Sequence, residues 1–188
     1  MVELSIVVPA YNEEDNVGML YRKISEVLKK QGSYEIIFID DGSVDKTFQI
    51  LKKIANNDKR VRVIKFRKNF GQTAAFYEGF QKAKGKIIVS MDADLQNDPF
   101  DIPRLIKKLD EGHDAVCGWR YDRIDPIGKK IFSFFANKTR KLLTNEKIHD
   151  SGCSLRAYKA NAIKSLDLFG EMHRFIPSLL AWKGFKVA

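Results

Sequence analysis

The chain has 188 residues, of which 44% are hydrophobic and 30% are charged, and its formal net charge is +9. This length and balance predict one globular domain with an extensive apolar core, and no segment is of low complexity. No apolar run approaches the roughly 18 residues that a membrane-spanning helix needs. The two cysteines, Cys117 and Cys153, lack metal-ligand spacing and predict a reducing compartment, with the cytoplasm as the default.

The positive charge favours an anionic partner, which can be a nucleic acid, an anionic membrane or a phosphorylated substrate. An ordinary basic surface is the alternative. Between Arg120 and Lys147 the chain carries eight Lys or Arg against three acids, a net charge of +5. More than half of the excess charge therefore belongs to one stretch.

Strands and helices alternate through the first 118 residues. Apolar runs predict strands over residues 4–8, 34–39, 61–66, 86–91 and 114–118. Helical periodicity predicts helices over 46–55, 71–84 and 102–110, and an earlier one that Asn12 or Asp15 caps and that runs to about Lys30. This alternation predicts an α/β fold with a mostly parallel sheet, in which ligands bind at the carboxyl ends of the strands.

Three polar clusters follow three of these strands, at residues 11–13, 40–45 and 92–96. The carboxyl ends of parallel strands lie at one edge of a sheet, so we expect the clusters to lie together there. Asp92 and Asp94 would point the same way if the strand geometry continued, and carboxylates are suitable ligands for Mg2+ or Mn2+. The alternative for Asp92-Ala93-Asp94 is that these residues open a helix. Three acidic strand ends favour a metal site that receives a diphosphate.

Other nucleotide and metal motifs are missing from the sequence. No Gly-x-Gly-x-x-Gly follows the first strand, which excludes a typical dinucleotide site. The stretch from Gly79 to Lys86 fails as a P-loop because Ile87 stands where Ser or Thr must hold magnesium. The three histidines are scattered and form no zinc-type pair.

The pattern changes after Arg120. Residues 127–143 place apolar and aromatic side chains on one side of a helix and lysines and arginines mainly opposite. Such a helix is typical of a membrane surface, and an ordinary helix packed on the sheet is the alternative. A polar turn from residue 147 leads into a short strand that reaches Tyr158, and helices are expected over 160–166 and 172–182. A strand begins at Gly184, and we expect the chain to be truncated before a C-terminal membrane anchor.

Several segments, in their order and spacing, resemble the family 2 glycosyltransferases of GT-A fold. The resemblance covers essentially the whole chain and is to the polyprenyl-phosphate glycosyltransferases related to dolichyl-phosphate mannose synthase. The segments are VPAYNE (8–13), DDGSVD (40–45), NFGQ (69–72), MDADLQ (91–96), GWR (118–120), DSG (150–152) and GEMHRFIP (170–177).

The resemblance implies a single Rossmann-like GT-A catalytic domain, with a mostly parallel central sheet flanked by helices, over residues 1–188. Its nucleotide-binding half would span about 1–118, and its acceptor- and membrane-facing half about 119–188. The implied activity is the inverting, metal-dependent transfer of a sugar from a UDP- or GDP-sugar to a polyprenyl phosphate, undecaprenyl or dolichyl. The implied location is the cytoplasmic face of the membrane, where the 127–143 helix would receive the lipid acceptor.

The resemblance also implies a role for individual residues. Those that would bind the nucleotide sugar are Pro9, Tyr11, Glu13, Ile39, Asp41, Asp92, Ala93 and Gln96. Those that would hold Mg2+ or Mn2+ are Asp92, Asp94 and Gln96. We also expect a catalytic role for Asp94, Arg120 and Asp150. Arg120 and Arg140 would bind the acceptor phosphate, which suits the bidentate guanidinium. Apart from the resemblance, we hypothesise that Asp150 is a base or an orienting carboxylate near the acceptor, and a cap of its own turn is the alternative.

Two other functions remain open at this point. A related transferase could pass the sugar to a saccharide hydroxyl, which calls for an essential base. A magnesium-binding signalling module of the receiver type also clusters carboxylates at strand ends, but its acidic pair follows the first strand. Nucleic-acid binding would account for the charge and would leave the acidic clusters unexplained. The sequence selects neither the donor base nor the sugar, and it leaves the oligomeric state open.

Overall fold

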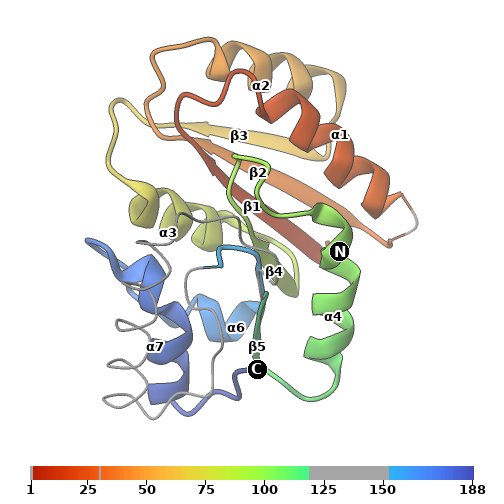
Figure 1. Cartoon of the computed structure of the whole chain (residues 1–188), viewed down its shortest axis with the longest axis vertical. Helices are drawn as coiled ribbons and strands as arrows, with labels where there is room; N and C mark the ends of the chain where they lie inside the picture. Colours follow the sequence, from red (N-terminus) through yellow and green to blue (C-terminus); the bar gives the residue numbers. More distant parts are fainter. Residues whose placement is uncertain (1, 30, 119–152) are drawn as a thin grey trace, which may run out of the picture.

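A single sheet forms the centre of the molecule in the computed structural model, which describes residues 2–29, 31–118 and 153–188 (Figure 1). Within these residues the strand order is β3-β2-β1-β4-β6-β5. The first four strands are parallel, and β6 is antiparallel to both β4 and β5. The strands are β1 Leu4–Ala10, β2 Tyr34–Asp40, β3 Val61–Lys65, β4 Ile87–Ser90, β5 Ala115–Cys117 and β6 Arg156–Lys159. The mostly parallel α/β sheet predicted from the sequence is confirmed.

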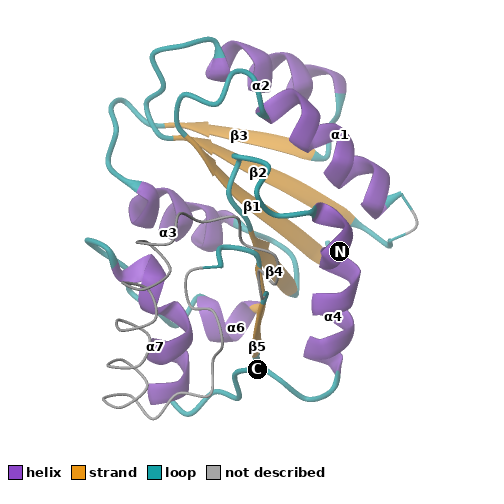
Figure 2. Ribbon diagram, viewed as in Figure 1, coloured by secondary structure: helices purple, strands orange, loops and turns teal. Residues whose placement is uncertain are grey.

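Helices cover both faces of this sheet (Figure 2). Helices α1, α2 and α4 close one apolar core, and α3, α6 and α7 close the other. The helices are α1 Val17–Leu28, α2 Thr47–Asn57, α3 Gln72–Lys82, α4 Ile102–Asp110, α6 Ala160–Ile163 and α7 Ile176–Trp182, with 3-10 turns η1 Pro99–Asp101 and η2 Met172–Phe175.

Strand β1 lies between β2 and β4, and every residue of β1 and β2 is buried. Burial on both faces explains their continuous apolar runs. The register pairs Ala10 with Asp40 at the end of β1, and Ser90 ends β4 beside Val7 and Arg156. The chain segments that follow β1, β2 and β4 therefore emerge at the same edge of the sheet.

The first helix differs from its prediction at its start. Its N-cap is Asn16, and neither Asn12 nor Asp15 caps it. Asn12 instead adopts a left-handed conformation with φ of 55°, which its short polar side chain tolerates. Its side chain is used in the loop that leads from β1.

The C-terminal elements are shorter than predicted. Residues 160–166 form only the single turn of α6. The 172–182 stretch begins as the 3-10 turn η2 and becomes helical at Ile176, with Pro177 in the first turn of α7, where its missing N–H is tolerated. Near the end of the chain Val187 makes a single parallel bridge to Ala115 of β5.

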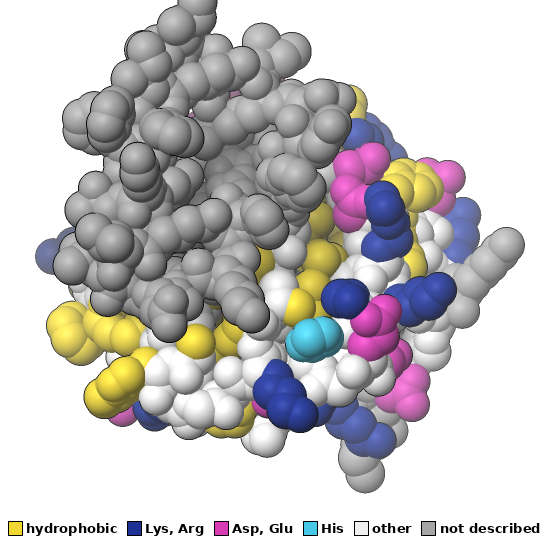
Figure 3. Space-filling model, turned by 60° about the horizontal axis from the view of Figure 1, so that its bottom comes forward, with side chains coloured by type: hydrophobic (Ala, Val, Ile, Leu, Met, Phe, Trp, Pro, Cys, Tyr) yellow, Lys and Arg dark blue, Asp and Glu magenta, His cyan; other side chains and the backbone are white. Residues whose placement is uncertain are grey.

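The basic amphipathic helix predicted over 127–143 lies outside the described residues. Among the described helices, none combines the length and apolar character needed to cross a bilayer. On the face shown in Figure 3, the coloured lysine and arginine side chains are interspersed with acidic ones.

Asp58, which follows α2, contacts α1 and the turn that leads into β3. Its two carboxylate oxygens accept hydrogen bonds from the Arg60 guanidinium at 2.9 and 2.8 Å and from the Tyr21 hydroxyl of α1 at 3.0 Å. The hydrogen bonds from Arg60 outweigh the opposing effect of burial and lower the pKa of Asp58 to about 2. The carboxylate is 9% exposed, so the ion pair is partly shielded from solvent.

We expect Asp58→Asn to destabilise the fold in a pH-dependent way. The folded-state pKa lies below the ordinary value of 3.8, so the stabilisation is complete well above that value and is lost as the pH falls through about 2. The cost in unfolding free energy should be about 2 kcal/mol near pH 6 and roughly half of that at pH 3. Urea unfolding at the two pH values measures it.

Asp101→Asn is the matched control, because the Asp101–Arg104 pair is well exposed and should contribute little at either pH. An Asp58→Asn cost that stays constant between pH 6 and pH 3 would show that the charge of Asp58 does not stabilise the fold.

Candidate functional site

A cavity of about 380 Å3 lies at the carboxyl ends of β1, β2 and β4. All three polar clusters contribute to its lining, as the sequence predicted. The lining residues are Pro9, Ala10, Tyr11, Glu13, Asp41, Asn69, Gly71, Gln72, Asp92, Ala93 and Asp94. The cavity is therefore the place where the predicted nucleotide and metal residues can act together.

Hydrogen bonds join the first cluster to the second. The Asn12 N–H donates to Ser43 Oγ at 3.0 Å, and Asn12 Oδ1 accepts from the Val44 N–H at 3.0 Å. The Glu13 N–H donates to Thr47 Oγ1 at 2.8 Å. These bonds fix the backbone at Asn12 and Glu13 against the loop that follows β2 and the start of α2.

The Asp45 carboxylate binds backbone N–H groups, and Asp45 is not among the residues that line the cavity. Its oxygens accept from the Thr47 N–H at 2.9 Å and from the Glu14 N–H at 3.2 Å. Burial acts to raise the pKa of Asp45, but hydrogen bonds from the Thr47 hydroxyl and from these N–H groups outweigh it and lower the pKa. This carboxylate belongs to the frame of the site.

Asp41 connects the end of β2 to the loop before α3. Its two oxygens accept from the Phe70 N–H at 2.8 Å and from the Gly71 N–H at 3.0 Å. The side chain is buried, and burial raises its pKa, with the neighbouring Asp40 charge acting in the same direction against the two N–H donors. Each carboxylate oxygen has a second lone pair, so Asp41 can still accept from a ligand donor.

The segment Asp92-Ala93-Asp94, called the DxD segment below, follows a strand that ends earlier than predicted. Strand β4 ends at Ser90, the chain bends over 93–95, and Leu95 has a left-handed φ of 61°. Strand geometry does not continue through Asp92 and Asp94, so the condition for strand alternation to orient them is not met. Both residues nevertheless line the cavity and are partly exposed.

The carboxylates of the DxD segment already have defined contacts. Asp92 Oδ1 accepts from Gln72 Nε2 at 2.6 Å, and Asp94 Oδ1 accepts from the Gln96 N–H at 3.0 Å. Neither opens a helix, because the next helical turn, η1, is capped by Asp98, which accepts from the Phe100 N–H. The helix-capping alternative is therefore wrong.

A divalent metal fits the Asp92 and Asp94 donor set. Within residues 2–29, 31–118 and 153–188, no three His, Cys, Asp or Glu side chains converge as a complete metal site. Magnesium, however, takes few protein carboxylates and fills its shell with water and phosphate oxygens. Two carboxylates on the wall of an open cavity meet that requirement when a diphosphate supplies the rest.

The other predicted residues divide into three groups. Pro9, Tyr11, Glu13 and Ala93 line the cavity, whereas the fully buried Ile39 belongs to the core beneath α3. The Gln96 side chain is exposed and is not among the lining residues, because the chain turns at Leu95, so its metal role stays a prediction. The three predicted residues Arg120, Arg140 and Asp150 lie outside the described residues.

Asn69, Gly71 and Gln72 line the cavity, although no site role is predicted for them from the sequence. The NFGQ segment was already part of the resemblance, so a signal was present. The sequence predicts a helix over 71–84, and nothing in that pattern indicates that Gln72 reaches Asp92.

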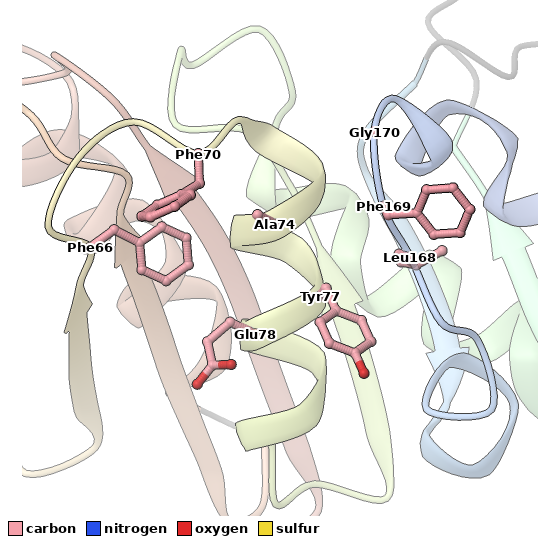
Figure 4. A pocket seen from close by; sticks show the side chains of 8 residues that line it. All are labelled: Phe66, Phe70, Ala74, Tyr77, Glu78, Leu168, Phe169 and Gly170. Atoms are coloured by element: carbon pink, nitrogen blue, oxygen red, sulfur yellow. The ribbon is translucent and has the colours of Figure 1, made fainter.

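A second cavity, of about 430 Å3, lies on the outer face of α3. In Figure 4, Phe66 and Phe70 lie on one side of α3, and Leu168 and Phe169 lie on the other. Phe70 is 57% exposed and Phe169 is 72% exposed. This cavity is apolar in character and contains none of the predicted nucleotide or metal residues.

The model of the family described as "Glycosyl transferase family 2" matches residues 5–167. Dodecaprenyl-phosphate galacturonate synthase of Rhizobium johnstonii is 42% identical over 184 residues, which cover 96% of this chain and 54% of that protein. Undecaprenyl-phosphate 4-deoxy-4-formamido-L-arabinose transferase of Edwardsiella ictaluri is 37% identical over 178 residues, or 94% of this chain and 55% of that protein. The chain spans about half the length of these curated relatives.

Solved structures share the fold. The mannosyltransferase PcManGT of Pyrobaculum calidifontis, in complex with GDP-Man and Mn2+, has a TM-score of 0.73 at 21% identity and covers 98% of this chain and 53% of that chain. Glucosyl-3-phosphoglycerate synthase of Mycobacterium tuberculosis, with Mn2+ and UDP-glucose, has a TM-score of 0.78 at 22% identity, over 100% and 68% of the two chains. These likenesses confirm the GT-A-like architecture.

Gly42 permits the close approach of the loop after β2 to the loop before α3. Its φ is +73°, and an added Cβ would lie 2.3 Å from the backbone carbon of Lys68. Gly184 has a similar φ of +87° but open space around its Cβ position. The two glycines therefore separate the cost of the backbone conformation from the cost of the contact.

We expect Gly42→Ala to lower the free energy of unfolding by about 1–3 kcal/mol more than Gly184→Ala does, because only Gly42 meets backbone that must move. Chemical unfolding of the two variants measures the difference. Equal losses would mean that the loops after β2 and before α3 can separate without cost.

Proposed function

Because the chain belongs to glycosyl transferase family 2, we propose that it transfers a sugar from a UDP- or GDP-sugar to a polyprenyl phosphate. The observation that carries this proposal is the cavity in which Asp92 and Asp94 lie together with Tyr11 and Asp41. The acceptor is suggested by two relatives, whose names specify dodecaprenyl and undecaprenyl phosphate.

The wall of the cavity formed by the loops after β1 and β2 suits a nucleoside. Tyr11 is 45% exposed and offers an aromatic face that can cover a base. Asp41 presents buried oxygens to ribose or base donors, while Pro9 and Glu13 complete the same wall. Ile39 supports this wall from the core beneath α3.

The part of the cavity formed by the segment after β4 suits a diphosphate and its metal. Asp92 and Asp94 would hold Mg2+ or Mn2+, with Gln96 as the third residue that the sequence suggests, and Ala93 brings backbone close to the same site. The ion would neutralise charge on the departing nucleoside diphosphate. PcManGT and the glucosyl-3-phosphoglycerate synthase carry Mn2+ in their complexes, which supports the choice of cation.

In the proposed reaction, a phosphate oxygen of the acceptor forms a bond to the anomeric carbon from the side opposite the leaving group. The bond from that carbon to the nucleoside diphosphate breaks, its electrons stay with the diphosphate, and the configuration inverts. A phosphate monoester carries about −1.5 to −2 charge at neutral pH, so the nucleophile needs little deprotonation. Asp150 would then orient the acceptor as much as deprotonate it.

The second half of the chain would bind the acceptor. We assign the acceptor phosphate to Arg120 and Arg140, and the contact with the cytoplasmic face of the membrane to the basic amphipathic stretch 127–143. The charge of residues 120–147 suits an anionic headgroup and an anionic lipid surface. Residues 1–118 would then form the donor half of one catalytic domain.

Incubation of the full chain with labelled nucleotide sugars and undecaprenyl phosphate tests the acceptor. The panel should pair UDP and GDP with common hexoses and should include galacturonate and 4-deoxy-4-formamido-L-arabinose, the sugars named for the relatives. We expect label to enter the organic phase with the lipid. Transfer to an oligosaccharide hydroxyl and not to the lipid phosphate would favour the saccharide alternative.

We expect Asp92→Asn to lower kcat/KM for transfer by at least about 100-fold, since charge stabilisation by a metal accounts for several kcal/mol of the barrier. The variant should also lose the rise in melting temperature that Mn2+ with UDP or GDP gives the parent chain. Asp110→Asn, an exposed carboxylate at the end of α4, is the control and should behave like the parent. Full activity of Asp92→Asn would overturn the metal role.

A further inference from the structure

A short side-chain hydrogen bond on the wall of the donor cavity joins two residues that lie 20 positions apart. Gln72, the first residue of α3, donates its Nε2–H to Asp92 Oδ1 at 2.6 Å. Both residues line the cavity. We propose that Gln72 is a positioning residue that holds the Asp92 carboxylate in the orientation that binds the divalent cation. This inference rests on the proposed function, because it assigns the metal to Asp92.

Asp92 lies outside β4, so regular strand geometry does not orient its side chain. A contact from another segment can supply that orientation. Asp92 follows the end of β4 at Ser90 and precedes a bend that passes through the left-handed Leu95. Asp94 is oriented differently, by the Gln96 N–H of its own loop. A hydrogen bond to a carboxylate is charge-assisted and roughly twice as strong as a neutral one, so the Gln72 amide can select one Asp92 rotamer.

The first turn of α3 is itself fixed on both sides of Gln72. On one side, the Gly71 N–H donates to Asp41 Oδ2 at 3.0 Å. On the other, Thr73 Oγ1 lies 2.6 Å from Nδ1 of His173 in η2. The His173 carbonyl accepts in turn from the buried Arg156 guanidinium at 2.9 Å. Gln72 therefore projects from a turn that both the β2 end and the C-terminal segment hold in place.

An amide is suited to this position. It donates to the carboxylate without adding a second negative charge beside it, and its length spans from α3 to the loop after β4. Residues that hydrogen-bond to metal ligands fix ligand orientation, and their removal typically costs about 10–100-fold in metal affinity or activity. A leucine in place of Gln72 keeps similar bulk and helix propensity and removes the amide, both its N–H donors and its carbonyl acceptor.

The test is the affinity of the full chain for Mn2+ in the presence of saturating UDP or GDP. Binding is followed by the loss of the electron paramagnetic resonance signal of free Mn2+. We expect Gln72→Leu to weaken Mn2+ about 10–100-fold. Nucleotide binding in EDTA should change by no more than about twofold, because the nucleoside wall is intact. Gln81→Leu is the matched control, since Gln81 is exposed on the same helix and should leave Mn2+ affinity unchanged.

The pair Gln72 and Asp92 should also be coupled. In an Asp92→Asn background, adding Gln72→Leu should weaken Mn2+ by much less than it does in the parent chain, because the supported carboxylate is already gone. A purely structural Gln72 would instead lower the unfolding midpoint of the metal-free chain and weaken Mn2+ equally in both backgrounds.

The outcomes separate this inference from the proposed function. If the parent chain binds Mn2+ with nucleotide and Gln72→Leu binds it equally well, the positioning role is overturned and the proposed function stands. If the parent chain shows no Mn2+ binding that depends on Asp92, both the metal role and the positioning role fall.

Discussion

The parallel pairing of β1 with β2 on one side and with β4 on the other determines the rest of the site. It brings the three loops that follow these strands to one edge of the sheet, and each loop contributes polar residues to the cavity. The pairing depends on strands that are buried on both faces, since only helices on each side can cover such a sheet. The same apolar runs that build the core therefore place the cavity.

The carboxylates at this edge have two different tasks. In the loop after β2, Asp45 holds the start of α2 and the loop after β1, whereas Asp41 holds the loop before α3 and also lines the cavity. Those after β4, Asp92 and Asp94, lie on the cavity wall with partial exposure. The acidic residues at this edge therefore serve a rigid frame as well as a ligand site. Removing a carboxylate that holds backbone should lower the stability of the fold more than it affects catalysis directly.

Much of this arrangement follows from the sequence, because period and burial are local signals. The apolar runs predicted the strands, the alternation with helices predicted the parallel sheet, and the three polar strand ends predicted one shared cavity. A magnesium-binding receiver module is contradicted by the family match over residues 5–167. What the sequence could not supply are contacts between distant segments: the Asn12 side chain turned toward the loop after β2, and the reach of Gln72 to Asp92. The bend after Ser90 was missed because strand periodicity says nothing about where a strand stops.

The central claim is that the edge cavity binds a nucleoside diphosphate through a cation on Asp92 and Asp94. Anomalous diffraction from crystals of the full chain grown with Mn2+ and UDP or GDP tests it most directly. The account predicts a manganese peak within coordination distance of both carboxylates, with the base against Tyr11. A nucleotide bound in this cavity with manganese absent or held by other residues would contradict the account.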